Sequence, residues 1–176
     1  MRKRFWVGGI PVLILVLIIG LFIVPNTLST KLLAAAKANG LVSYTPEEAT
    51  ELAYGRCTTC HGADKMLQYC SRCGPPFVVV AHSMKKFVEL ANLKTEVIKP
   101  FSDAELNAIT QVWNALVGNW EGDWRKQDIR KLLQGDDALL RLAETSLEER
   151  PIEWALKDKT APGSYKEIQS FGRASK

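Results

Sequence analysis

The sequence predicts an all-α protein in which a single N-terminal transmembrane helix precedes a small helical domain with a helical C-terminal extension. Three observations lead to this prediction. Phe5 to Val24 is an apolar run of twenty residues, capping-box patterns at Thr45 and Ser102 open helices, and apolar residues recur at helical spacing after Pro76. The expected segments are anchor 1–30, spacer 31–44, helical domain 45–117 and extension 118–176.

The apolar run is long enough to cross a membrane, because a helix rises about 1.5 Å per residue and twenty residues span about 30 Å. Arg2, Lys3 and Arg4 precede the run, and no charged residue follows until Lys31. This pattern predicts a cytoplasmic N-terminus with the rest of the chain in the periplasm, in a single-pass protein of a bacterial inner membrane. A cleaved signal peptide is the alternative, but its apolar region is shorter, about 7 to 15 residues.

The composition beyond this run excludes several classes of function. Three of the 23 basic residues are Arg2, Lys3 and Arg4, so the remaining 20 nearly balance the 19 acidic residues. This balance predicts no nucleic-acid binding. The sequence contains no G-x-G-x-x-G, no G-x-x-x-x-G-K-[ST] and no H-E-x-x-H, so it predicts neither a nucleotide site nor a zinc protease.

The spacer between the apolar run and the helical domain carries no functional motif. It is expected to be helical and to end at Gly40.

Cys57, Cys60 and His61 form the pattern C-x-x-C-H, which is the attachment signature of a c-type haem. Two thiols one helical turn apart can bond two vinyl groups of one porphyrin, and the imidazole that follows can bind the iron as the proximal ligand. A thioredoxin-like redox motif is the alternative, but it expects a βαβ context that the sequence does not show. The sequence therefore predicts one covalently attached haem c.

Two predicted helices flank this motif. Thr45, Pro46 and Glu48 are typical of a helix start, and this helix delivers Cys57. The capping box at Ser102 opens an amphipathic helix with one apolar stripe, formed by Leu106, Ile109, Val112, Trp113 and Leu116. A helix before C-x-x-C-H and an amphipathic helix that closes a short domain resemble the class I cytochrome c family over residues 45–117. The resemblance implies that the two helices cross beside the haem.

The family usually supplies a Met as the second iron ligand, and the candidates are Met84, His82 and Met66. Pro75-Pro76 predicts the start of a helix whose apolar stripe contains Phe77, Val80, Ala81, Met84, Phe87, Val88 and Ala91. His82 lies about 200° from Met84 on this helix, so the stripe favours Met84 and leaves His82 as the alternative. Met66 ranks last, because it follows His61 by only five residues. The spacing of Phe77 and Met84 resembles the cytochrome domains partnered with sulfite-dehydrogenase-type enzymes.

A second pair, Cys70 and Cys73, has Gly74 where a haem site has its histidine. Outside the cytoplasm two such close thiols are normally oxidised, so a local disulfide is the expectation. A zinc site would need further ligands, with His82 the nearby candidate, and a redox-active dithiol is a further alternative.

The C-terminal extension is expected to form two helices, 123–134 and 136–149, with Pro151 ending the second and a loosely ordered tail from Lys157 to Lys176. Two interpretations stay open for it. It either covers the haem domain as a helical annex or docks the protein onto a larger complex, with Trp120, Trp124 and Trp154 as contact residues.

These observations together predict a membrane-tethered, monohaem c-type cytochrome that carries single electrons between redox complexes on the outer face of the membrane. The prediction includes no enzymatic activity and no small-molecule substrate, and its partners are the membrane and redox proteins. The side chains expected to bury the haem are Tyr54, Phe77, Phe87 and Trp113. The alternatives are a fixed haem-bearing subunit of a respiratory or photosynthetic complex, and a haem sensor or enzyme with an open sixth site.

Overall fold

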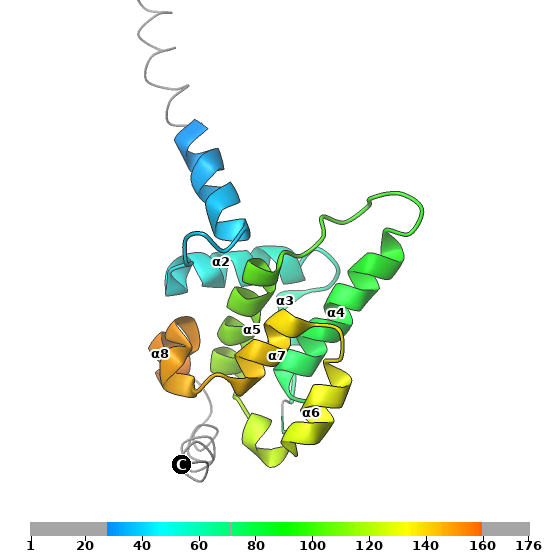
Figure 1. The fold of residues 1–176 in the computed structure, drawn as a ribbon, viewed down its shortest axis with the longest axis vertical. Helices are drawn as coiled ribbons and strands as arrows, with labels where there is room; N and C mark the ends of the chain where they lie inside the picture. Colours follow the sequence, from blue (N-terminus) through cyan, green and yellow to red (C-terminus); the bar gives the residue numbers. More distant parts are fainter. Residues whose placement is uncertain (1–27, 71, 160–176) are drawn as a thin grey trace, which may run out of the picture.

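The computed structural model describes residues 28–70 and 72–159, and within these residues every regular element is a helix. Figure 1 shows α5 (Asp103–Val117) at the centre of the body, with the other helices packed around it. The elements around it are α2 (Pro46–Cys57), α3 (Ala63–Leu67), α4 (Phe77–Ala91), α6 (Lys126–Leu132), α7 (Asp137–Glu144) and α8 (Pro151–Leu156). Three 3₁₀ turns, Glu121–Asp123, Leu147–Glu149 and Lys157–Lys159, lie in the C-terminal extension, and a further helix over residues 28–38 precedes α2. The all-α prediction is confirmed for this part of the molecule.

The same residues contain no helix that is long and apolar enough to cross a membrane. The longest elements, α4 and α5, have 15 residues each, or about 22 Å of helix, against a hydrocarbon thickness of about 30 Å. This finding contradicts the transmembrane helix in the predicted fold class, and with it the predicted single-pass location in a bacterial inner membrane. The apolar run on which both predictions were based, Phe5 to Val24, lies outside the described residues.

Residues 28–38 form a helix that stands away from the body in Figure 1 and ends as the sequence predicts. Gly40 adopts a φ of 73°, and the N–H groups of Gly40 and Leu41 donate to the carbonyls of Lys37 and Ala36. This is a Schellman motif, in which a glycine takes the left-handed conformation that other residues rarely adopt. The Lys37 ammonium pairs with Glu48 and so ties this helix to the first turn of α2.

Both predicted capping boxes are confirmed. The Thr45 hydroxyl accepts the Glu48 N–H while the Glu48 carboxylate accepts the Thr45 N–H, at the start of α2. The same reciprocal pair joins Ser102 and Glu105 at the start of α5. Because each box satisfies two amide groups that a helix start leaves unpaired, the two helices begin at defined residues.

The core of the molecule follows the length of α5. Leu106, Val112, Trp113 and Ala115 are at most 1% exposed, and α2, α4, α7 and α8 all pack against this helix. The predicted apolar stripe of α5 is therefore confirmed, but the helix is buried on more sides than the stripe alone requires. Thr110, Gln111 and Asn114 are buried as well, and the C-terminal extension contacts the last two through Ile152 and Glu153.

The extension has more breaks than predicted. The second expected helix, 136–149, is α7 followed by a 3₁₀ turn, because Thr145 and Ser146 adopt extended backbone with ψ near 136° and 155°. Pro151 begins α8 instead of ending a helix, since proline fits the first helical turn, where no N–H partner is needed. The tail beyond Lys159 lies outside the described residues.

A buried group of charges fastens the extension to α5. The Arg150 guanidinium contacts Glu121 at 2.7 Å and Glu153 at 3.2 Å, and Glu153 also accepts from Asn114 and Asn119. Burial alone lowers the pKa of Arg150, but the two carboxylates outweigh it and raise that pKa. Burial raises the pKa of Glu153 although Arg150 opposes the change. The described extension thus packs against α5, and Trp154 is its most exposed tryptophan at 38%, while Trp120 and Trp124 are partly buried.

Candidate functional site

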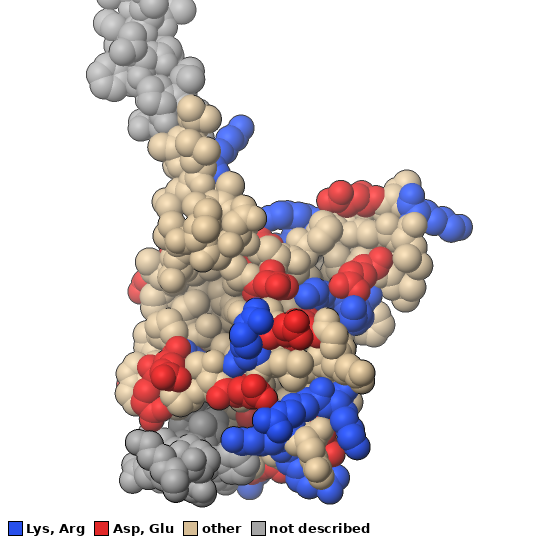
Figure 2. Space-filling view, viewed as in Figure 1, with Lys and Arg blue, Asp and Glu red and all other residues tan. Residues whose placement is uncertain are grey.

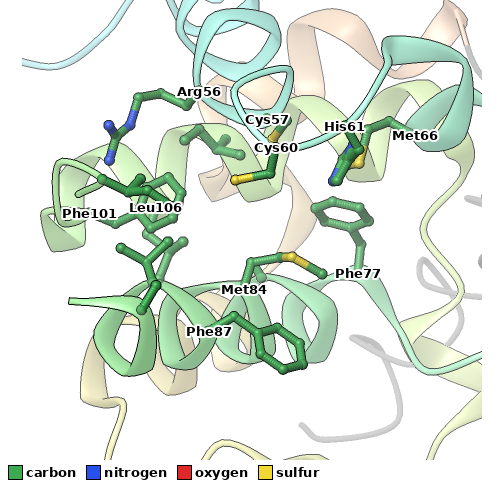
Figure 3. A pocket seen from close by; sticks show the side chains of 15 residues that line it. Arg56, Cys57, Cys60, His61, Met66, Phe77, Met84, Phe87, Phe101 and Leu106 are labelled. Carbon is green, nitrogen blue, oxygen red and sulfur yellow. The ribbon is translucent and has the colours of Figure 1, made fainter. Parts of the chain in front are cut away.

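An apolar cavity of about 340 Å³ lies between the end of α2 and α4, with α5 behind it (Figure 3). Its volume falls within the range of small-molecule and cofactor sites. The cavity collects residues from four helices and two connecting segments. They are Arg56, Cys57, Cys60, His61, Met66, Phe77, Ala81, Met84, Phe87, Val88, Ala91, Ile98, Phe101, Leu106 and Ile109.

The C-x-x-C-H residues form one wall of this cavity. Cys57 is the last residue of α2, and Cys60 and His61 lie in the turn that follows. The Trp113 indole N–H donates to Cys57 Sγ at 3.3 Å, and burial raises the pKa of the Cys57 thiol. Cys60 is exposed, and His61 Nδ1 lies 3.4 Å from the carbonyl oxygen of Gly62. The two thiols and the imidazole predicted to hold the haem therefore line one cavity together.

The facing wall is α4, which presents the predicted apolar stripe. Met84 lies near the middle of this wall and points into the cavity towards the side of Cys60 and His61 (Figure 3). His82 does not line the cavity. Its Nδ1 atom lies 3.3 Å from Asp136 Oδ2, and Lys85 contacts the same carboxylate oxygen at 3.1 Å. The structure thus separates the two ligand candidates, because His82 faces the start of α7 while Met84 faces the C-x-x-C-H wall.

Met66, the candidate ranked last, also lines the cavity but from the other wall. It belongs to α3, is 7% exposed, and lies beside His61 in Figure 3. A side chain next to the proposed proximal ligand is on the wrong side to be the opposite ligand of the same iron. Met66 therefore packs on the same wall of the cavity as His61.

The four aromatic residues predicted to bury the haem divide into two pairs. Phe77 and Phe87 line the cavity, Phe77 at 3% exposure and Phe87 at 62%. Tyr54 and Trp113 do not line it, but the two rings pack together with centroids 5.2 Å apart, and Phe77 lies 6.2 Å from Trp113. Tyr54 and Trp113 therefore support the cavity wall from behind, where Trp113 also holds Cys57.

Sequence reasoning missed the end of the cavity formed by Arg56, Ile98 and Phe101. The segment between α4 and α5 carries Ile98 and Phe101, and the Asn92 side chain sets its shape. Asn92 Oδ1 accepts the N–H groups of Val97 and Ile98, and its amide donates to the Ile98 carbonyl. A loop whose shape depends on one asparagine has no periodic sequence pattern from which its cavity residues could be predicted. Arg56 could have been predicted, because it directly precedes the C-x-x-C-H motif.

The second cysteine pair lies away from the cavity. Cys70 and Cys73 are joined by a disulfide with a Cα–Cα distance of 5.2 Å, in the segment between α3 and α4. The Tyr69 hydroxyl closes this segment further by donating to the Pro75 carbonyl at 2.6 Å. The zinc alternative has no support here, because within residues 28–70 and 72–159 no three His, Cys, Asp or Glu side chains are placed to hold a metal ion.

The residues of the cavity fit the haem that the sequence predicts. Its lining supplies two thiols, an imidazole and the thioethers of Met66 and Met84 among apolar side chains. Its one arginine has a buried nitrogen, Arg56 Nε, with no hydrogen-bond partner. Thiols and an imidazole on one wall match covalent attachment and proximal ligation, and a facing thioether matches a His/Met iron. The orphaned guanidinium nitrogen matches an anionic group, which haem carries in its two propionates.

Comparison of the chain with protein-family models, with curated proteins and with solved structures finds no match. Function is therefore inferred from the residues of the site, the cavity walls on which they lie and the chemistry they allow.

Proposed function

We propose that this protein is a monohaem c-type cytochrome that carries single electrons between redox partners and catalyses no reaction of its own. One observation supports this more than any other. The C-x-x-C-H residues and Met84 lie on facing walls of one apolar cavity, while the competing ligand His82 is turned away towards Asp136. A haem in this cavity supplies an iron that alternates between the ferric and ferrous states.

Each part of the chain has a defined task in this proposal. Cys57 and Cys60 hold the macrocycle by thioether bonds, and His61 binds the iron from the wall at the end of α2. Met84 binds from α4, and a thioether ligand raises the reduction potential relative to a second histidine. Phe77, Leu106 and Ile109 exclude water from the cavity, which keeps the surroundings fixed while the charge on the iron changes.

The fold holds the two thiols of the motif in different surroundings. Trp113 is fully buried in the central helix and donates to Cys57 Sγ, so the first attachment point is held by the core. Cys60 is exposed at the mouth of the cavity, where the chain remains accessible for the second bond. Met84, facing this wall, argues against a sensor or an enzyme with an open sixth site.

The first experiment tests attachment. The full chain is expressed in cells that mature c-type cytochromes, and haem is stained on a denaturing gel. Cys57→Ala/Cys60→Ala is expected to abolish the stain, because no thiol of the motif remains to form a thioether. Cys70→Ala/Cys73→Ala is the matched control and is expected to retain it, because that pair lies outside the cavity. Absence of covalent haem in the unmodified chain would refute the proposed function.

The second experiment tests the ligand assignment by spectroscopy of the loaded protein. Met84→Leu is expected to abolish the methionine-to-iron charge-transfer band of the ferric protein and to let the ferrous protein bind carbon monoxide. Met66→Leu removes a thioether from the opposite wall with similar volume, and it is expected to change neither signal. His82→Ala serves as a further control. Loss of the band in His82→Ala or Met66→Leu, but not in Met84→Leu, contradicts the assignment.

A further inference from the structure

Arg56 is the one cationic side chain among the residues that line the cavity. It precedes Cys57 in the last turn of α2 and reaches across to the segment between α4 and α5. Its Nη2 atom donates to the carbonyls of Lys99 and Pro100 at 2.6 and 3.0 Å, and its guanidinium carbon lies 4.4 Å from the centre of the Phe101 ring. These contacts engage one nitrogen and one face of the guanidinium.

The Nε atom of Arg56 is buried and has no hydrogen-bond partner within the described structure. Buried polar groups are normally paired, and a buried donor without an acceptor costs about 1–3 kcal/mol, more when the group is charged. The cavity residues around this end, Ile98, Phe101 and Leu106, offer no side-chain acceptor. The unmet need of Nε is for a hydrogen-bond acceptor, and an anionic acceptor would pair with the guanidinium charge as well.

We propose that Arg56 binds a propionate carboxylate of the haem and thereby sets which edge of the macrocycle lies at the Phe101 end of the cavity. This inference depends on the proposed function, because haem supplies the carboxylate. A guanidinium recognises a carboxylate by charge-assisted hydrogen bonds, which are stronger than those between neutral groups. Figure 3 shows Arg56 and Phe77 at opposite ends of the cavity, so the propionate edge lies away from Phe77.

Lys99, a cation in the segment that Arg56 contacts, already has a partner. Lys99 Nζ contacts Glu105 Oε1 at 2.7 Å, and its side chain is 65% exposed and does not line the cavity. Lys99 thus provides a matched control, because its replacement removes a positive charge beside the same loop without touching the cavity. Arg56 itself has two roles to separate: it ties the loop by its Nη2 bonds, and it binds the carboxylate.

The test uses the haem-loaded full chain and its Arg56→Gln, Arg56→Lys and Lys99→Gln variants. Reduction potential and the propionate bending band in resonance Raman spectra are measured for each. Arg56→Gln is expected to lower the potential, because a positive charge near the haem disfavours the ferric state, and to shift the propionate band. Arg56→Lys is expected to restore most of the potential but not the band, since an ammonium lacks the planar fork. Lys99→Gln is expected to leave the band unchanged.

The outcomes separate this inference from the proposed function. If Arg56→Gln lowers the melting temperature but leaves both the potential and the propionate band unchanged, Arg56 only ties the loop and the inference is wrong. If Arg56→Gln does not fold, an unshifted band in Arg56→Lys contradicts the inference equally well. An unmodified chain that attaches no haem overturns the proposed function, and the propionate contact with it.

Discussion

On one face of α5 the chain leaves an apolar cavity lined by sulfur atoms and an imidazole, whereas on another face it buries an arginine between two carboxylates. Leu106 and Ile109 form the back of the cavity, while Gln111 and Asn114 bond to α8, with the Gln111 side chain accepting the Ile152 N–H. On the polar face the charged groups and the Asn114 amide donor are paired within the chain, and the Asn114 Oδ1 atom alone among them is buried without a partner in the described structure. The side chains on the cavity face are available to contact a group that the chain itself does not supply.

This difference separates stability from function. The contacts of Arg150 are internal, so they contribute to folding whatever the cavity contains. Of the cavity residues, Cys60 and Phe87 are exposed and the Nε atom of Arg56 lacks a partner, so the contribution of these groups depends on the bound group. Substitutions in the extension are therefore expected to act on unfolding alone, and substitutions at the cavity to act on the haem.

The largest effect is expected for Arg150→Leu in the extension. This change leaves Glu121 and Glu153 buried without their cation, and breaking a buried pair in this way costs about 3–5 kcal/mol. Denaturant unfolding of the loaded protein measures the loss. Arg130→Leu is the control, because Arg130 pairs with Glu144 at 2.7 Å on the surface and such pairs contribute less than about 1 kcal/mol. Similar losses for the two variants would contradict this account.

An intermediate effect is expected at Asp136, which joins the two regions. Its carboxylate caps α7 through the Leu139 N–H and contacts His82 and Lys85 on the outer face of α4. Burial alone raises the pKa of Asp136, but these hydrogen bonds and the Lys85 charge outweigh burial and lower it. A lowered pKa means that the carboxylate stabilises the fold above about pH 4 and that this contribution is lost as the pH falls further.

Asp136→Asn keeps a capping side chain but removes the charge, so a loss of about 1 kcal/mol is expected at neutral pH. The difference from the unmodified protein should shrink as the pH falls below about 4, because the unfolded chain then takes up a proton at Asp136 before the folded protein does. Unfolding free energies measured from pH 7 to pH 3 test this. Asp137→Asn, at the exposed neighbouring position, is expected to show no such trend with pH. The same trend in both variants would show that the pH dependence does not come from the Asp136 carboxylate.

The sequence was most informative where the signal was local and periodic. The capping boxes placed α2 and α5, and the 3.6-residue repeat separated Met84 from His82 on α4 before their surroundings were known. It was least informative where one side chain organises a loop, as Asn92 does for the nearby Ile98 and Arg56 for the distant Pro100. Pro151 shows a third case, because a proline after a helix either ends it or starts the next, and only packing against α5 decides.

The smallest expected effect concerns Phe87, and it tests whether the cavity face depends on its ligand. Phe87 is 62% exposed and Leu132 of α6 is 46% exposed, so solvent exposure alone predicts that Phe87→Ala costs no more than Leu132→Ala. Phe87 lines the cavity and Leu132 does not. A haem that covers the ring adds about 1 kcal/mol to the cost of Phe87→Ala in the loaded protein, because the ring then loses buried apolar contact. Equal losses in thermal unfolding of the two loaded variants would place Phe87 outside the haem contact, and the open edge of the cavity would then lie at this side chain.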